Sequence, residues 1–251
     1  MKIFILFFLL FFYSSNLFAA ESSTKSLPQH EWSFEGITGT FDRGALQRGY
    51  QVYSEVCSGC HSLKLLYYRD LIDIGFSEDQ VKAIASEFTV IDGPNDEGEM
   101  FERDARPADR FVSPYLNDNE ARANNNGAYP PDLSVITKAK KNGEDYIHNL
   151  LLGYHDEPEG LELGDGMYYN KWVEGQQIAM PAPLYDESVD FDDGTDNNLE
   201  QLSRDLVTFL KWSAEPVLEI RKQMGIKVIL FLIFLGFIMY LIKNRMWKDV
   251  T

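Results

Sequence analysis

The clearest pattern of apolar positions outside the two long apolar runs lies toward the C-terminal end, in residues 198–216. Apolar and small residues recur there at intervals of three and four, which places them on one stripe of a helix. The stripe consists of Leu199, Leu202, Leu206, Phe209, Leu210 and Ser213. The residue before a proline is biased away from helical geometry, so the helix should end near Pro216. We therefore predict an amphipathic helix that packs this stripe against the rest of the molecule.

Four shorter segments upstream also indicate helices by their spacing and their end signals. One begins with Ser77 and Gln80, which together form a capping box at a helix start. Another starts at Asp132, a favoured N-cap residue, and stops at a glycine. The first of the four leads directly into the cysteine at position 57. We predict helices over residues 42–56, 77–88, 132–143 and 144–153.

Two long stretches between these helices are rich in Gly, Pro, Asn and Asp, namely residues 92–131 and 154–197. Such composition is typical of loops. No alternating pattern of a half-buried strand stands out anywhere in the chain. The predicted fold is therefore mostly α, with long loops, and loops of this length in a compact domain usually serve a purpose.

The chain begins with a run of apolar residues that shows no helical periodicity. Lys2 is followed by an uncharged run from Ile3 to Tyr13 and by the small residues Ala19 and Ala20. A run of this length suits a secretory signal peptide, and it is too short to span a bilayer. We assign residues 1–20 to the signal peptide, with a first membrane span as the alternative, and residues 21–40 to a polar lead-in.

A second apolar run, Met224 to Ile242, is 19 residues long and contains a single charge, Lys227. At about 1.5 Å per residue it crosses a hydrocarbon core of about 30 Å, provided that Lys227 extends its ammonium outward. A buried core helix is the alternative, but this run is apolar on every face. Because the signal peptide exports the preceding part, the tail should remain in the cytoplasm. The predicted order is a domain over residues 41–215, a connector and membrane helix over 216–243, and a cytoplasmic tail over 244–251.

Charge limits the partners of the exported part. The whole chain has 39 acidic and 23 basic residues, and removing Lys2 with the signal peptide leaves a net charge of 22 − 39 = −17. Such a surface repels nucleic acid and attracts basic partners. The most acidic stretches are residues 155–165 and 186–196.

Both cysteines of the chain lie in one motif, CSGCH at residues 57–61. A disulfide here would close a very small loop and contribute little stability. A thioredoxin-type redox pair, the main alternative, belongs in a βαβ unit that the sequence does not show. Cys-x-x-Cys-His is the attachment signature of c-type haem, in which the histidine ligates iron. We predict one covalent haem c on Cys57 and Cys60, with His61 as an axial ligand.

A haem iron has a second axial position. Its candidate ligands in the exported part are His30, Met100, His148, His155, Met167 and Met180. We favour Met180, because prolines stiffen its loop and Ile178 and Ala179 are apolar neighbours suited to a haem edge. On the residues alone, His148 and His155 stay open as alternatives.

Five segments in order resemble the cytochrome c1 family, the haem subunit of the bacterial and mitochondrial cytochrome bc1 complex, and they extend over nearly the whole mature chain. They are the attachment motif, ARANNNGAYPPDLSVI, GEDYIHNLLLGY, GQQIAMPAPLYDE and FLKWSAEP, followed by a C-terminal membrane span. The resemblance implies that Met180 is the sixth ligand of iron. It also implies that Arg122 lies near a haem propionate, and that the turn containing Pro130 and Pro131 packs on the His61 side.

The same resemblance implies an electron carrier of the respiratory chain in the bacterial inner membrane, with its cytochrome domain in the periplasm. Its partners would be cytochrome b, a Rieske iron–sulfur protein and a basic soluble cytochrome c that docks on the acidic loops. With both axial positions filled, the isolated chain would have no substrate site, and the complex would be a quinol–cytochrome c oxidoreductase. Another membrane-anchored monohaem carrier, or a haem peroxidase or sensor, is the alternative.

Overall fold

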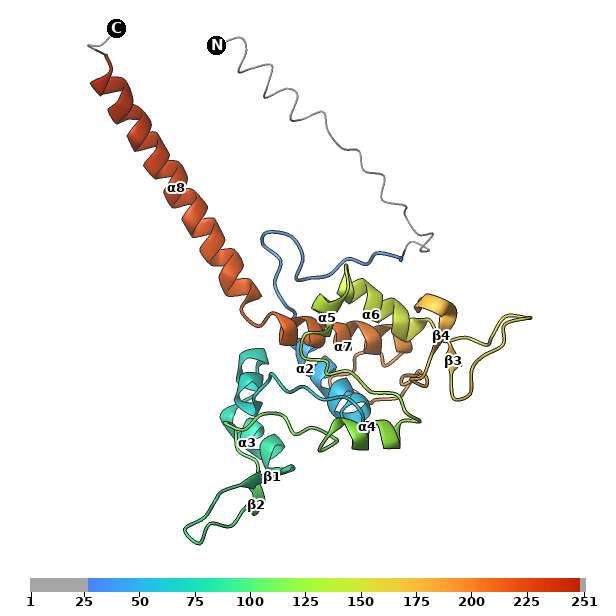
Figure 1. Ribbon diagram of the computed structural model, residues 1–251. Helices are drawn as coiled ribbons and strands as arrows, with labels where there is room; N and C mark the ends of the chain where they lie inside the picture. Colours follow the sequence, from blue (N-terminus) through green and yellow to red (C-terminus); the bar gives the residue numbers. More distant parts are fainter. Residues whose placement is uncertain (1–26, 249–251) are drawn as a thin grey trace, which may run out of the picture.

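The computed structural model of the chain describes residues 27–248, and it is mostly helical as predicted. A body of packed helices and loops carries one long helix that projects away from it (Figure 1). The predicted signal peptide, residues 1–20, and the last three residues of the tail lie outside the described residues.

Two helices from opposite ends of the body form its centre, α2 (Arg43–Val52) and α7 (Leu199–Ala214). They cross at Gly49, where an added Cβ would lie 2.0 Å from the carbonyl oxygen of Asp205. Only glycine permits this close approach of the two backbones. Both helices were predicted, and α2 continues as a π-helical turn, Tyr53–Cys57, that ends at the first cysteine.

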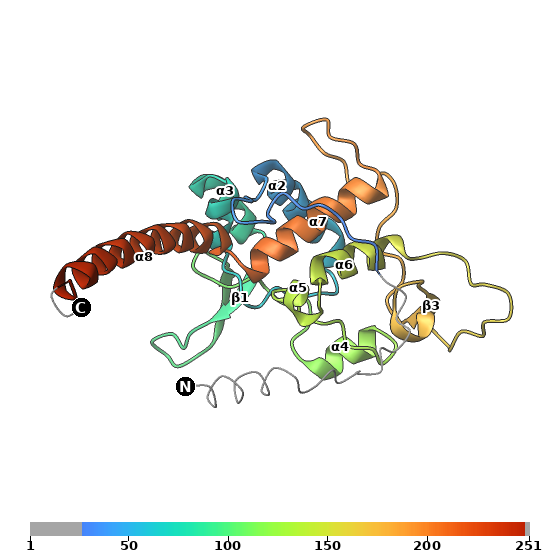
Figure 2. The same ribbon diagram turned by 90° about the horizontal axis from the view of Figure 1, so that it is seen from above.

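Shorter helices pack around this pair. Helix α6 (Gly143–Leu152) lies against α7 (Figure 2). Helix α3 (Glu78–Ser86) begins at Ser77, whose hydroxyl accepts from the amide of Gln80, while the Gln80 side chain accepts from the amide of Ser77. The predicted capping box is therefore confirmed. Helix α3 packs on a 3₁₀ helix, Tyr68–Ile74, that the sequence pattern did not reveal.

The prediction of one helix over residues 132–143 was wrong. Only α5 (Ile136–Ala139) is helical, because the Asp132 carboxylate accepts hydrogen bonds from residues 62 and 64 as well as from Ser134. These bonds hold residues 132–135 in an irregular turn. Asn142 then adopts a left-handed conformation with φ of 50°, which separates α5 from α6.

The predicted loops contain more regular structure than their composition suggested. Helix α4 (Asp118–Asn124) begins at Asn117, whose side chain accepts from two backbone amides. Short strands are also present, although no alternating pattern marked them in the sequence. Strands β1 (Thr89–Asp92) and β2 (Phe101–Asp104) pair antiparallel, as do β3 (Tyr168–Tyr169) and β4 (Gln177–Ile178), beside a 3₁₀ turn at Glu174–Gln176. Strands of two to four residues are too short to show an alternating pattern.

Helix α8 (Leu218–Met246) contains the predicted membrane span. It is the single helix among residues 27–248 that is long and apolar enough to cross a membrane, and its apolar window is not buried against the body. Buried core residues extend beyond the predicted domain limits of 41 and 215, to Trp32 and Phe34 on one side and Leu218 on the other. The packed body therefore includes the described part of the lead-in around Trp32 and Phe34, and the first turn of α8.

Candidate haem site

The attachment motif forms a tight turn at the end of the central helix. After the π-helical turn, the amides of Cys60 and His61 both donate to the carbonyl oxygen of Cys57, at 3.1 and 2.9 Å. Cys57 is buried and Cys60 is exposed. Burial raises the pKa of the Cys57 thiol to about 12. A catalytic redox cysteine needs a lowered pKa, so this environment opposes the thiol redox alternative.

The His61 ring is held by a backbone oxygen from a distant segment. Its Nδ1 lies 2.8 Å from the carbonyl oxygen of Pro131. A carbonyl oxygen can only accept, so Nδ1 carries the hydrogen and Nε2 keeps its lone pair. Burial also lowers the pKa of His61, which favours the neutral ring. Metal-ligating histidines usually bind iron or zinc through one nitrogen while the other donates to such a partner.

Asp132 fastens the segment after His61 to the segment that holds Pro131. Its Oδ2 accepts from the Ser62 hydroxyl and the Lys64 amide, each at 2.8 Å, and its Oδ1 accepts from the Ser134 amide at 2.9 Å. Burial alone would raise the pKa of Asp132, but these hydrogen bonds outweigh it and hold the pKa below its ordinary value. The Pro131 carbonyl is thus fixed relative to His61.

Two further contacts support this arrangement. The Tyr53 hydroxyl donates to the carbonyl oxygen of His61 at 2.9 Å, so the π-helical turn is tied to the end of the motif. The Ser213 hydroxyl of α7 donates to the carbonyl of Ser134 at 3.0 Å. No local pattern marks Tyr53, Asp132 or Ser134 as site residues, because the contacts that matter join segments that are separated along the chain.

Met180 lies two residues after strand β4, at the end of the β3–β4 hairpin, and is half-buried. The hydroxyl of Tyr154 donates to the Met180 carbonyl oxygen at 3.1 Å. Burial raises the pKa of Tyr154, so this hydroxyl keeps its proton. The loop that carries Met180 is therefore tied to the second residue after α6.

His148 lies inside the body. Its side chain is fully buried on α6, its Nδ1 is 2.8 Å from the Ser203 hydroxyl of α7, and its ring contacts those of His30 and Trp32. Burial, together with the positive charge of Arg204 and the neighbouring His30, lowers the pKa of His148 to about 4. The structure therefore places His148 in the core, with His30 half-buried beside it.

The other candidates lie on exposed or loop positions. His155 is exposed in an acidic loop, and Met100 is 60% exposed next to β2. Met167 is half-buried in a turn closed by its own amide and the Gly164 carbonyl. Among the six candidates, Met180 combines partial burial with a loop fixed by a long-range hydrogen bond.

Arg122 stands on α4, upstream of the two prolines. Its Nη1 donates to the Gly127 carbonyl at 3.0 Å, and its guanidinium carbon lies 5.5 Å from the centre of the Tyr129 ring. It thereby stabilises the turn that leads to Pro130 and Pro131. These contacts give Arg122 a role in positioning the loop, and the guanidinium is exposed.

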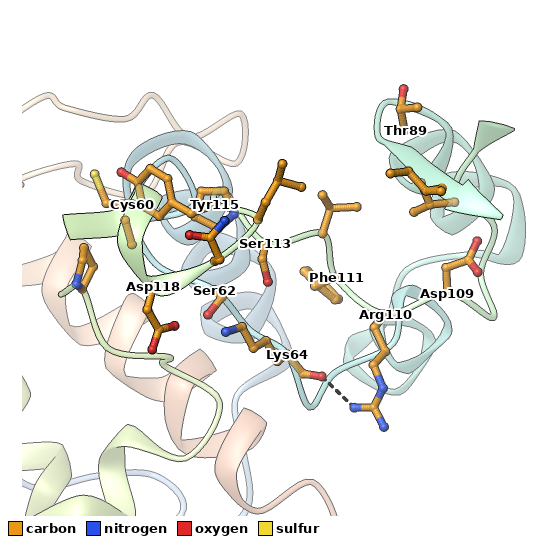
Figure 3. A pocket seen from close by; sticks show the side chains of 18 of the residues that line it. Cys60, Ser62, Lys64, Thr89, Asp109, Arg110, Phe111, Ser113, Tyr115 and Asp118 are labelled. Atoms are coloured by element: carbon orange, nitrogen blue, oxygen red, sulfur yellow. Dashed lines mark hydrogen bonds between the residues drawn. The ribbon is translucent and has the colours of Figure 1, made fainter. Parts of the chain in front are cut away.

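A cavity of about 510 Å³ opens beside Cys60. Pro130 is among its lining residues. Cys60 and Tyr115 lie at one end of the cavity and Thr89 at the other (Figure 3). His61 and Met180 are not part of its lining, so this cavity borders the attachment motif on the Cys60 side rather than enclosing both predicted iron ligands. The donor set itself fits a covalently held haem: two thiols on one turn, and an imidazole whose Nε2 is free because Nδ1 is bonded.

A mostly helical body with long loops and a Cys-x-x-Cys-His turn at the end of its central helix defines a c-type cytochrome. Comparison with known proteins identifies the family of c-type cytochromes to which it belongs. The model of the cytochrome c1 family matches residues 32–250, which is most of the chain. The chain belongs to the cytochrome c1 family, whose members carry one covalent haem c and act as electron carriers of the cytochrome bc1 complex in the respiratory chain.

Similar proteins from bacteria and from mitochondria support this family assignment. Cytochrome c1 of Rhodospirillum rubrum is 43% identical over 241 residues, which cover 90% of this chain and 89% of that protein. "Cytochrome c1 2, heme protein, mitochondrial" of Arabidopsis thaliana is 48% identical over 82% of this chain and 67% of its own length. "Cytochrome b/c1" of Bradyrhizobium diazoefficiens is 46% identical over 92% of this chain, which spans 37% of that longer protein.

Proposed function

We propose that Cys57 and Cys60 hold the haem, that His61 and Met180 are the axial ligands of its iron, and that electrons pass from a Rieske iron–sulfur protein to a basic soluble cytochrome c. The observation that carries this proposal is the hydrogen bond from His61 Nδ1 to the Pro131 carbonyl. It leaves Nε2 available to a metal and fixes the plane of the ring.

The bound haem supplies a one-electron couple, and the residues of the chain hold and tune it. The two cysteines tether the ring on one turn. The Pro131 carbonyl orients His61, and the Tyr154 hydroxyl fixes the backbone of Met180. A thioether ligand stabilises ferrous iron and raises the potential relative to two histidine ligands. Filling both axial positions leaves no open site for substrate, which suits an electron relay.

We further propose cytochrome b and the Rieske protein as neighbours in the complex. The Bradyrhizobium relative carries both cytochrome names in one chain, "Cytochrome b/c1". An anchor such as α8 would place the haem domain beside a membrane-embedded partner. The acidic loops would attract a basic cytochrome c through charge complementarity.

The proposed orientation follows from the predicted export signal and from α8. The haem domain would lie in the periplasm, on the outer face of the bacterial cytoplasmic membrane, with residues after 243 in the cytoplasm. Residues Lys243, Arg245 and Trp247 at the end of α8 suit a membrane interface.

Haem staining of denaturing gels tests the attachment directly. Cys57→Ser and Cys60→Ser should each strongly reduce covalent haem, because each thiol supplies one link. Ser58→Ala, which changes a residue between the two cysteines, is the matched control and should stain as the wild type. Normal covalent haem in both cysteine variants would contradict the proposal. Carbon monoxide binding to the native reduced protein would instead favour a peroxidase or sensor.

A further inference from the structure

Residues 28–41, which we call the strap, belong to the predicted polar lead-in up to residue 40, yet they form part of the packed body. The strap runs past α6 and α7 and reaches the start of α8 (Figure 1). Its Trp32 and Phe34 side chains are buried, and their rings stack with centres 5.5 Å apart. A disordered polar lead-in would not bury two aromatic rings.

The first end of the strap is fixed to α6. The Asp145 carboxylate, which is buried, accepts from the Trp32 indole Nε1 at 2.9 Å and from the His30 amide at 3.1 Å. The Asn149 side chain donates to the Pro28 carbonyl at 2.9 Å. These hydrogen bonds fix this end of the strap to the body.

The middle of the strap is a closed loop, residues 33–40. The Thr40 amide donates to the Ser33 carbonyl at 3.0 Å. Gly36 has a φ of +68°, and a Cβ at Gly39 would lie 1.8 Å from the carbonyl oxygen of Glu35. The two glycines allow a turn too tight for other residues. The loop consequently presents the carbonyl oxygens of Phe34 and Gly39 toward one point.

Lys222 of α8 occupies that point. Its ammonium donates to the Phe34 carbonyl at 2.5 Å and to the Gly39 carbonyl at 3.1 Å. An ammonium has three donors, and charge-assisted bonds to two oxygens of a fixed loop hold it in one place. Lys222 lies two residues before the apolar run that begins at Met224.

Glu219, one helical turn earlier on the same side of α8, makes the complementary contacts. Its Oε1 accepts from the Phe41 amide at 2.7 Å, and its Oε2 pairs with Arg43 Nη2 at 2.7 Å. Phe41 ends the strap and Arg43 begins α2. The first turn of α8 is thus bonded to both ends of the segment from residue 34 to residue 43.

We infer that Glu219 and Lys222 are positioning residues that lock the anchor helix to the haem domain and thereby set the orientation of the haem relative to the membrane. The covalent connection from α7 to α8 is only Glu215–Val217, and it holds the helix on one side, where Glu215 pairs with Lys211 of α7 and Arg221 of α8. The strap holds the helix on a second side. Transfer between fixed partners depends on their relative placement, so a locked angle would serve electron entry and exit.

Electron paramagnetic resonance of the oxidised complex in oriented membrane multilayers measures this angle. In Lys222→Met and Glu219→Gln, the angular dependence of the haem signal should weaken or shift, while haem content and the optical spectrum stay normal. Lys222→Arg should retain the wild-type angle, because a guanidinium also donates to carbonyls. Lys82→Met is the matched control, because Lys82 is exposed on α3 and pairs with Asp79 of the same helix.

An unchanged angular distribution in both Lys222→Met and Glu219→Gln would overturn the inference. Amide hydrogen exchange of the wild-type complex provides a test that needs no variant. The Thr40 and Phe41 amides should exchange slowly, and exchange at the rate of a free loop would also overturn it. The inference rests on the presence of haem, which staining reports separately, so its failure is distinguishable from failure of the proposed function.

Discussion

At the scale of single residues, the site depends on a carboxylate that touches no proposed haem ligand. Asp132 bonds the segment after His61 to the turn that carries Pro131. The Pro131 carbonyl in turn fixes the tautomer of His61. The placement of an axial histidine therefore rests on hydrogen bonds formed 70 residues apart along the chain.

Asp132→Asn should destabilise the protein by about 1–3 kcal/mol. Both carboxylate oxygens of Asp132 accept hydrogen bonds, and the substitution replaces one of them with an NH₂ group, which would face a donor instead of accepting from it. Thermal unfolding of the detergent-extracted holoprotein, followed by circular dichroism, measures the effect. Asp156→Asn changes the same charge at an exposed position and should leave the midpoint unchanged. A midpoint for Asp132→Asn equal to that of Asp156→Asn would contradict this role.

The difference in stability between the wild type and Asp132→Asn should depend on pH in one direction. The pKa of Asp132 in the folded protein lies below its ordinary value of 3.8. A carboxyl group with a depressed folded pKa stabilises the fold at pH values above its unfolded pKa, and this contribution is lost as pH falls through the folded value. The gap between wild type and Asp132→Asn should therefore narrow in acid below about pH 4.

At the scale of elements, the sequence predicts best where the signal is local. The capping box of Ser77 and Gln80 and the stripe of α7 depend on neighbours within one or two turns, and both were found. The segment 132–143 had an equally good local signal, but Asp132 bonds to distant residues instead of capping a helix. For the site, Cys57, Cys60 and His61 come from one motif, whereas the partners of His61 could not be read from it.

Truncation tests where the packed body ends. A chain cut after Gln223 should be soluble and should carry haem, because it keeps the buried Leu218 and the contacts of Glu219 and Lys222 with the strap. A cut after Trp212 removes Ser213 and Leu218 as well, so less folded, haem-loaded protein should result. The soluble fraction after ultracentrifugation, scored by haem stain, measures both. Equal yields would show that the first turn of α8 contributes nothing to the body.

At the scale of the whole molecule, the two acidic loops differ in what their charges do. In the 186–196 loop, Asp193 pairs with Arg48, and Asp186 accepts from the Leu199 amide at the start of α7. Those carboxylates stabilise the fold. The 155–165 loop follows Tyr154, which holds Met180, and its acidic side chains are exposed. It is therefore the better candidate for attracting a basic partner.

Neutralising the 155–165 loop should slow electron transfer to a basic cytochrome c by roughly 10-fold at low salt and should flatten the salt dependence. At about 0.15 M ionic strength the screening length is about 8 Å, so the effect should shrink there. The changes are Asp156→Asn, Glu157→Gln, Glu159→Gln and Glu162→Gln. Stopped-flow oxidation of the reduced haem at several ionic strengths measures the rate.

The matched control removes the same charge from exposed positions on other elements, with Asp73→Asn, Asp96→Asn, Glu97→Gln and Glu102→Gln. This variant should keep a rate closer to that of the wild type. Equal slowing in both variants would show that net charge, and not the 155–165 loop, sets the encounter rate. Electron entry from quinol should stay unchanged in both.

We propose an electron carrier whose iron lies between His61 and Met180, and a redox titration of Met180→Leu tests this ligand pair. The variant should keep its covalent haem, show a lowered reduction potential because the thioether is lost, and bind carbon monoxide when reduced. His155→Ala should titrate as the wild type and bind none. A Met180→Leu protein with the wild-type potential and no carbon monoxide binding would contradict the account, and a changed potential in His155→Ala would point to the other ligand.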